Sequence, residues 1–316
     1  MAERGLGVEL GAALLKVVLL ERTRDGDEVV AAAVRETPAG AIVGGRVLQP
    51  EAVSKSLREL LKSAQVTHKK CFLALGKQSV ILRTVQLPVM PERELREAVR
   101  WEAEKHLQFP LEEAVVDYTG VREIKSEDGN KLELYLAAVQ KEVVHGYLEA
   151  AAAAGLNPVA VDVETFALFR LLLYLGGPAA ENDARHASLL LDAGEEASGI
   201  LIAEGGRLVF QRVVSLSQEA DPGDLSREVQ RSVDYYFYNS RERESQLRQV
   251  WLVGAGSKRG PLLERLRDDL EIEPQVLNPF MSMKIQKKSV NLELNDAAPH
   301  LAVACGLALR GWRHGS

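Results

Sequence analysis

Hydrophobic and polar positions along the chain predict an alternation of strands and helices. In the first 75 residues, short apolar runs separated by a polar turn at residues 24–27 are typical of a strand meander. Apolar residues then recur at helical spacing, and a buried strand follows. The predicted order is β-β-β-α-β, with strands at residues 8–10, 16–20 and 28–34, a helix at 49–64 and a strand at 71–75.

The pattern changes after residue 78, where a second group of short elements begins. We interpret residues 79–140 as a small inserted module, because the helix that follows them continues the first unit. A helix, a strand and a further helix then complete that unit. The predicted elements are strands at 79–86, 115–124 and 132–139, a helix starting at Pro91, a helix at 141–154, a strand at 158–163 and a helix at 164–175.

Residues 176–183 are rich in turn residues and carry no apolar period, which indicates a linker. The opening meander then recurs, with strands predicted at 188–191, 198–203 and 208–214. The second half therefore repeats the first. We predict an α/β protein with a first lobe at 1–178 that contains the insertion, a second lobe at 184–298, and a C-terminal helix at 299–316 that returns to the first lobe.

Composition narrows the function classes. The chain has 316 residues, 39 Lys and Arg against 45 Asp and Glu, and a net charge of −6. Its length suits two domains, and its mixed charges do not favour binding to nucleic acid. No run of 18 apolar residues predicts a membrane span, and neither a signal peptide nor a Cys and His spacing typical of zinc is present. Cys71 and Cys305 lie in apolar surroundings and are expected to be buried thiols.

A repeated acidic turn is the main candidate for chemistry. Glu9 and Gly11 follow the first strand of the first half, and Asp192 and Gly194 follow the first strand of the second half. Glycine permits a tight turn whose backbone N–H groups can face a phosphate, while the carboxylate can hold Mg²⁺ through water. Each turn alone is also compatible with a plain hairpin.

A third glycine turn supports a nucleotide site. Gly254 and Gly256 lie between a strand and a helix, where the backbone can approach a base or ribose, although an ordinary connection has the same pattern. Upstream, Glu228 and Arg231 lie on the polar side of a predicted helix. They can reach ribose hydroxyls or form a surface ion pair.

The chain resembles the PilM family of cytoplasmic actin-like proteins of type IV pilus assembly. The most specific segments are residues 83–95, 103–114 and 117–118, with further similarity at 161–168, 210–212, 228–236 and 302–311. The resemblance implies an actin-like fold of duplicated ribonuclease H-like β-β-β-α-β-α lobes with a small inserted α+β subdomain. It also implies an ATP-binding cleft between the lobes.

The resemblance assigns roles to individual residues. Glu9, Gly11 and Lys16 fall at the first phosphate turn, and Glu9 and Asp192 are the candidates for Mg²⁺ through water. The remaining assignments are Asp192, Gly194 and Ser198 at the second phosphate turn, Gly254 and Gly256 at the adenosine turn, and Glu228 and Arg231 on the ribose side.

Several residues depart from the family pattern. Glu9 replaces an aspartate, and Ala12 and Ala13 replace hydroxyl residues that donate to phosphate. Glu195 and Glu196 add negative charge beside the second turn. These changes predict weak or absent hydrolysis and place ATP and Mg²⁺ occupancy in question.

The resemblance further implies a partner. An extended N-terminal cytoplasmic peptide of a PilN-like membrane protein is expected to bind the first lobe, which would bring a cytoplasmic protein to the inner membrane and to other components of the pilus platform. We place the peptide where the first lobe meets the inserted module, near Leu87, Trp101 and Phe109. A related type II secretion complex is an alternative setting.

Two other function classes stay open. A small-molecule kinase of the same superfamily needs a base near the acceptor hydroxyl, and Asp162 is the available carboxylate. A cell-division protein similar to FtsA needs an amphipathic C-terminal anchor, and the tail at 311–316 is too short for one.

Overall fold

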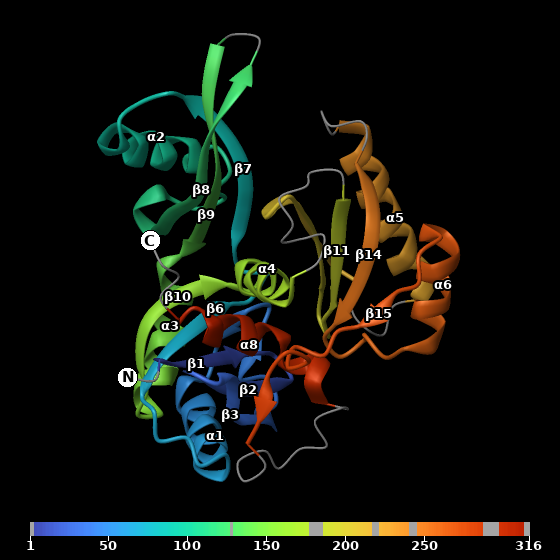
Figure 1. Ribbon diagram of the computed structural model, residues 1–316. Coiled ribbons are helices and arrows are strands. Elements are labelled where there is room, and N and C mark those ends of the chain that lie inside the picture. Colours follow the sequence, from blue (N-terminus) through green and yellow to red (C-terminus); the bar gives the residue numbers. More distant parts are fainter. Residues whose placement is uncertain are drawn as a thin grey trace.

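The computed structural model describes residues 3–126, 129–176, 186–216, 221–239, 245–286 and 297–312. Two lobes lie side by side, and a smaller module extends from the first (Figure 1). Most of the predicted linker at 176–183, including the lobe boundary at 178, lies outside the described residues, as does residue 184.

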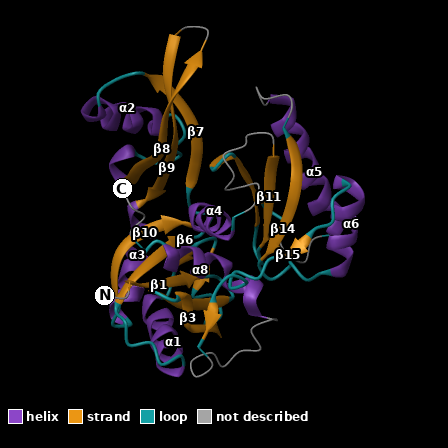
Figure 2. Cartoon of the chain, in the orientation of Figure 1, coloured by secondary structure: helices purple, strands orange, loops and turns teal. Residues whose placement is uncertain are grey.

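The first lobe is built on a six-stranded sheet of order β10-β6-β1-β2-β3-β16. β1, β2 and β3 form an antiparallel meander, and β1, β6 and β10 run parallel, so their carboxyl ends meet at one edge. Helices cover both faces of this sheet (Figure 2). The elements are β1 (Glu3–Leu10), β2 (Leu14–Thr23), β3 (Gly26–Glu36), β4 (Ile42–Val43), β5 (Arg46–Val47), α1 (Pro50–Ser63), β6 (Lys70–Leu75), α3 (Lys141–Ala153), β10 (Asn157–Val163) and α4 (Glu164–Leu175).

The second lobe repeats this plan in a five-stranded sheet of order β13-β12-β11-β14-β15. β11, β12 and β13 form a second antiparallel meander, and β14 runs parallel to β11. The duplication predicted from the recurring strand pattern is therefore present. The elements are β11 (His186–Ala193), β12 (Ser198–Glu204), β13 (Arg207–Val214), α5 (Pro222–Asn239), β14 (Gln246–Val253), α6 (Gly260–Leu270) and β15 (Gln275–Val276).

The inserted module is a three-stranded sheet of order β7-β9-β8 covered by one helix, and its β8-β9 hairpin projects away from both lobes (Figure 1). Alternate residues of β7 point into a small separate core under α2. The elements are β7 (Ile81–Pro88), α2 (Glu92–Glu104), the 3₁₀ helix η1 (Leu111–Glu113), β8 (Ala114–Ser126) and β9 (Gly129–Gln140).

The return to the first lobe begins earlier than the sequence predicts. β16 (Lys284–Ile285) pairs with β3 in the first sheet, within the range 184–298 that we expected to belong to the second lobe. The chain then continues through the 3₁₀ helix η2 (Ala298–Leu301) into α8 (Ala302–Leu309). A two-residue strand carries no readable periodicity, which explains the difference.

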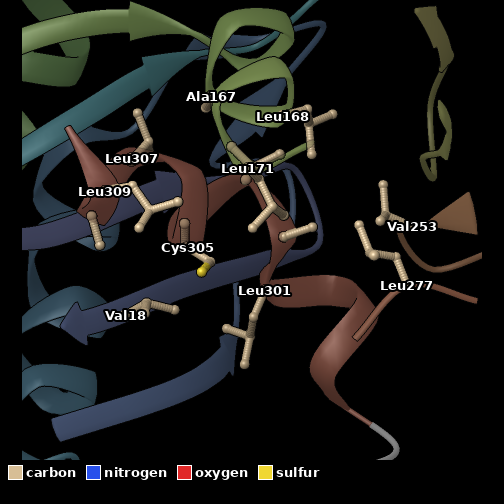
Figure 3. Close-up of a cluster of buried hydrophobic side chains, with 14 of the residues drawn as sticks. Val18, Ala167, Leu168, Leu171, Val253, Leu277, Leu301, Cys305, Leu307 and Leu309 are labelled. Atoms are coloured by element: carbon tan, nitrogen blue, oxygen red, sulfur yellow. The ribbon is translucent and has the colours of Figure 1, made fainter. Parts of the chain in front are cut away.

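α8 packs closely between β1 and α4. A Cβ on Gly7 would lie 1.9 Å from the carbonyl oxygen of Ala304, and one on Gly306 would lie 2.0 Å from that of Ala167. The small residues of these elements therefore let the backbones meet. Figure 3 shows that the same apolar cluster contains Leu168 and Leu171 of α4 together with Val253 and Leu277 of the second lobe. A continuous core therefore joins the two lobes, and we call this shared core the hinge.

Candidate functional site

A cavity of about 100 Å³ lies where the two acidic turns face each other between the lobes. Glu9 lies on β1 and Gly11 in the turn after it in the first lobe, and Asp192 lies on β11 and Gly194 in the turn after it in the second lobe. The two turns were predicted from the repeated sequence pattern, and the fold brings them together. Further lining residues are Lys16, Gly45, Gly76, Lys77, Tyr147, Glu164, Glu195, Glu196, Gly254 and His300.

Glu9 and Lys16 are cross-strand neighbours on β1 and β2. The Lys16 ammonium donates to Glu9 Oε1 at 2.6 Å, and both side chains are nearly buried. Burial raises the pKa of Glu9 to about 7, against the lowering by Lys16, while Glu164 and Asp192 raise it further. Glu9 Oε2 is buried and has no hydrogen-bond partner among the described residues. That oxygen is available to a proton or a ligand.

Asp192 is held across the cleft by Lys77, a residue that the sequence analysis missed. The Lys77 ammonium lies 2.5 Å from Asp192 Oδ2 and 3.2 Å from Glu164 Oε2. Burial alone would lower the pKa of Lys77, but Asp192 and Glu164 raise it well above its ordinary value. Lys77 therefore carries a full charge inside the cleft. Its position shortly after a parallel strand, at the edge where Glu9 also lies, is the signal that could have identified it.

The glycines of the turns provide space rather than donors. A Cβ on Gly194 would lie 2.4 Å from the carbonyl oxygen of Ala197, and one on Gly254, whose φ is +85°, would lie 2.7 Å from Asp192 Oδ1. The Gly11 and Gly194 amides, however, donate to Leu14 and Asp192 carbonyls at 3.1 and 3.0 Å. These N–H groups are thus used within the turns, contrary to their expected orientation toward a phosphate.

Four predicted nucleotide residues do not line the cavity. Ser198 is buried and donates its hydroxyl to the Leu216 carbonyl at 2.9 Å, and the Gly256 amide donates to Ala193. Glu228 and Arg231 lie on α5 and pair with each other at 2.7 Å, which is the surface ion pair considered above. Their contact with a nucleotide stays a prediction.

The cavity is smaller than the range of about 300–1,000 Å³ that is usual for ligand pockets. Glu195 and Glu196 both line it, and Glu196 accepts a hydrogen bond from the Gly44 amide of the first lobe at 3.2 Å. The described residues contain no group of three His, Cys, Asp or Glu side chains arranged to hold a metal. The orphaned Glu9 oxygen nevertheless suits a magnesium ion, and the ammonium groups of Lys16 and Lys77 suit a phosphate.

A second, more apolar groove of about 480 Å³ lies between the first lobe and the inserted module. β10 and α4 supply Val161, Phe166 and Phe169, and the hairpin supplies Val115, Tyr118 and Tyr135. Its position is the junction at which the sequence analysis expected a peptide, but its lining differs from the three residues named there.

Leu87, Trp101 and Phe109 do not form a common surface in this groove. Leu87 is buried beneath α2 in the core of the module. Trp101 lies on α2 and is 67% exposed, and Phe109 is half-buried in the connection that follows. β10 and α4, rather than the α2 segment, form the wall of the groove that faces the module, and peptide binding at Leu87, Trp101 and Phe109 stays a prediction.

Asp162 does not have the surroundings of a catalytic base. It lies at the apolar groove, where Arg170 and Arg310 contact the same carboxylate oxygen at 2.9 and 2.8 Å. Two guanidinium groups therefore occupy this oxygen. A kinase role for Asp162 thus finds no support in this geometry.

Comparison with known proteins agrees with the fold. The family model of the type IV pilus assembly protein PilM matches residues 7–217 and 223–312. The chain is similar to a solved PilM-PilN type IV pilus biogenesis complex, with a TM-score of 0.83 and 32% identity over 97% of this chain and 98% of that chain.

Two more distant structures show the fold alone. The ethanolamine utilization protein EutJ from Carboxydothermus hydrogenoformans has a TM-score of 0.53 and 16% identity over 97% of this chain and 89% of its own. A protein with an actin-like ATPase fold from Bacteroides thetaiotaomicron has a TM-score of 0.53 and 11% identity over 89% and 93%. The predicted actin-like fold is confirmed. In the described part of the chain, no helix has the length and apolarity to cross a bilayer.

Proposed function

The chain belongs to the PilM family of type IV pilus assembly proteins, and we propose that it is a cytoplasmic scaffold that binds a PilN-like membrane protein and a nucleotide. The observation that carries this proposal is the similarity to a PilM-PilN complex across nearly the whole of both chains. A partner that crosses the inner membrane would place the scaffold at the cytoplasmic face and link it to other platform components.

We propose that the partner's N-terminal cytoplasmic peptide occupies the apolar groove between β10, α4 and the hairpin. Valine and aromatic side chains on both walls can bury the apolar side chains of an extended peptide.

Two exposed valines on β8 give a matched test of this placement. Val115 lines the groove and is 41% exposed, whereas Val121 on the same strand lies outside it and is 44% exposed. Val115→Asp should weaken binding of a synthetic PilN-like N-terminal peptide at least about tenfold in calorimetry, because a charge enters an apolar contact. Val121→Asp and Trp101→Ala should bind as the parent does. Parent-like affinity for Val115→Asp would remove this placement.

The second site is proposed to bind ATP with Mg²⁺ between the lobes. Lys16 and Lys77 would offset the charge of the phosphates, and the acidic residues Glu9 and Asp192 would hold magnesium through its water shell. Magnesium supplies charge neutralisation at the phosphates when it is bound. Weak or absent hydrolysis follows from the acidic second turn and from Ala12 and Ala13.

Thermal unfolding with and without excess Mg-ATP tests nucleotide binding. At about 100 times Kd, a ligand that binds only the folded state stabilises it by about 2.7 kcal/mol. The shift should be present in the parent and absent in Lys16→Ala and in Gly194→Glu, which fills the second turn. An unchanged melting temperature in the parent would contradict nucleotide binding, and the proposed function would then be that of a scaffold that acts through its peptide partner alone.

A further inference from the structure

Lys77 is the described side chain that joins the two lobes through a buried ion pair. It follows β6 and Gly76 in the first lobe, and its ammonium lies 2.5 Å from Asp192 Oδ2 in the second. Both side chains are largely buried, with 14% and 8% exposure. Solvent screens a buried pair of this kind less than a surface pair. Removing one of its partners also costs more stability, because it leaves the other charge buried without a partner.

The second lobe is shaped around this lysine. A Cβ on Gly194 would lie 3.2 Å from Lys77 Nζ, and a Cβ on Gly199 would lie 3.4 Å from Lys77 Cε. Two glycines, one in the turn and one on the neighbouring strand, therefore leave room for the side chain to enter. This independent feature indicates that the crossing is a built contact.

Glu164 holds the same ammonium from the first lobe. Its Oε2 lies 3.2 Å from Lys77 Nζ and accepts a hydrogen bond from the Lys77 amide at 3.3 Å. When Asp192 is released, Lys77 keeps this partner and stays at the cleft. An ammonium has three donors, so it can replace one carboxylate with a phosphate oxygen without losing the other.

We propose that Lys77 is a latch that closes the cleft through Asp192 in the absence of nucleotide and transfers to the terminal phosphate when nucleotide is present. Transfer frees Asp192 to hold the water shell of magnesium, which its pairing with Lys77 otherwise opposes. The first half of this proposal concerns the contact between the lobes, and the second half rests on the proposed nucleotide function.

The Glu9 and Lys16 pair provides a matched control. Lys16 has the same 14% exposure and an equally close carboxylate partner, but both residues belong to the first lobe. Removing Lys16 thus deletes a buried cation of the same cavity without deleting a contact between lobes.

The experiment measures the distance between spin labels at Lys55→Cys on α1 and Glu264→Cys on α6, two exposed positions in different lobes. The native Cys71 and Cys305 are buried and would not take the label. Without nucleotide, Lys77→Ala and Asp192→Asn should each give a longer and broader distance distribution than the parent, whereas Lys16→Ala should match the parent. Asp192→Asn preserves the side-chain volume, so it serves if Lys77→Ala fails to fold.

Mg-ATP affinity separates the two proposals. The Lys77→Ala variant should bind Mg-ATP at least about tenfold more weakly than the parent, because the contact with the phosphate is lost. Saturating Mg-ATP should also change the distance between the labels in the parent. Parent-like distances in both cleft variants would overturn the latch even if ATP binds. If the distances are longer in those variants but the parent does not bind ATP, the contact between Lys77 and Asp192 would be supported as the one that closes the cleft. The same result would overturn both the transfer of Lys77 to a phosphate and the proposed nucleotide site.

Discussion

At the level of single residues, the buried carboxyl of Glu9 gives the molecule a pH dependence. Its pKa is raised from 4.5 to about 7, so the folded state holds a proton there that the unfolded chain releases at lower pH. The contribution of Glu9 to stability is therefore fully present below about pH 4.5 and is lost as the pH rises through 7.

Replacing Glu9 with glutamine removes this titration. The free energy of unfolding of the parent, measured relative to Glu9→Gln by chemical denaturation, should fall as the pH increases from about 5 to 8. A relative stability that stays constant over this range would show that Lys16, rather than burial, governs Glu9, because a lowered pKa would move the titration of Glu9 below this pH range.

The same residues show what the sequence could predict of the site. Glu9 and Asp192 were predicted because each precedes a spacer and a glycine after a strand, and this local pattern occurs twice. Lys77 and Glu164 belong to no local pattern, and they meet Asp192 only because parallel strands and two lobes bring distant segments to one cavity. Contacts of this kind follow from topology rather than from spacing.

At the level of elements, close packing of α8 makes its glycine a sensitive position. In most helix interiors, Gly→Ala is stabilising by about 1 kcal/mol because alanine has the higher helix propensity. Gly306→Ala should instead destabilise the protein by at least about 2 kcal/mol, because the new methyl group would meet the Ala167 backbone. Thermal or urea unfolding measures the difference.

Gly260, at the start of α6, is the control for this prediction. A Cβ there meets no atom within 4 Å, so Gly260→Ala should be neutral or slightly stabilising. Equal effects of the two substitutions would mean that α8 shifts to admit the methyl group without cost.

Periodicity predicted most of the regular elements of both lobes, because their apolar faces are long enough to repeat. It predicted α4 (Glu164–Leu175) as a helix, and the structure explains its nearly continuous apolar sequence: α4 packs on α8 in the first lobe and against β12 of the second. The short β16 and the course of the chain before it were missed, since pairing to β3 involves only two residues.

At the level of the whole molecule, the shared apolar cluster should make the lobes unfold together. Leu168, Val253 and Leu301 belong to one core, which includes β-sheet residues of both lobes (Figure 3). Because this core is continuous, separation of the lobes at the cleft does not require their separation at the hinge. Two lobes that open and close around a ligand can thus remain one cooperative folding unit.

The native tryptophans allow each lobe to be followed separately. Trp251 lies on β14 of the second lobe, and Trp312 follows α8 on the first, where Arg22 lies 4.0 Å from its ring centre and Tyr174 lies beside it. In a Trp101→Phe background, single-tryptophan variants that keep either Trp251 or Trp312 should give coincident urea transitions. Leu301→Ala should lower both midpoints together, with a cost of about 2–5 kcal/mol. Separate midpoints, or a shift confined to one tryptophan, would show that the lobes fold independently and that the hinge core is only a contact between finished domains.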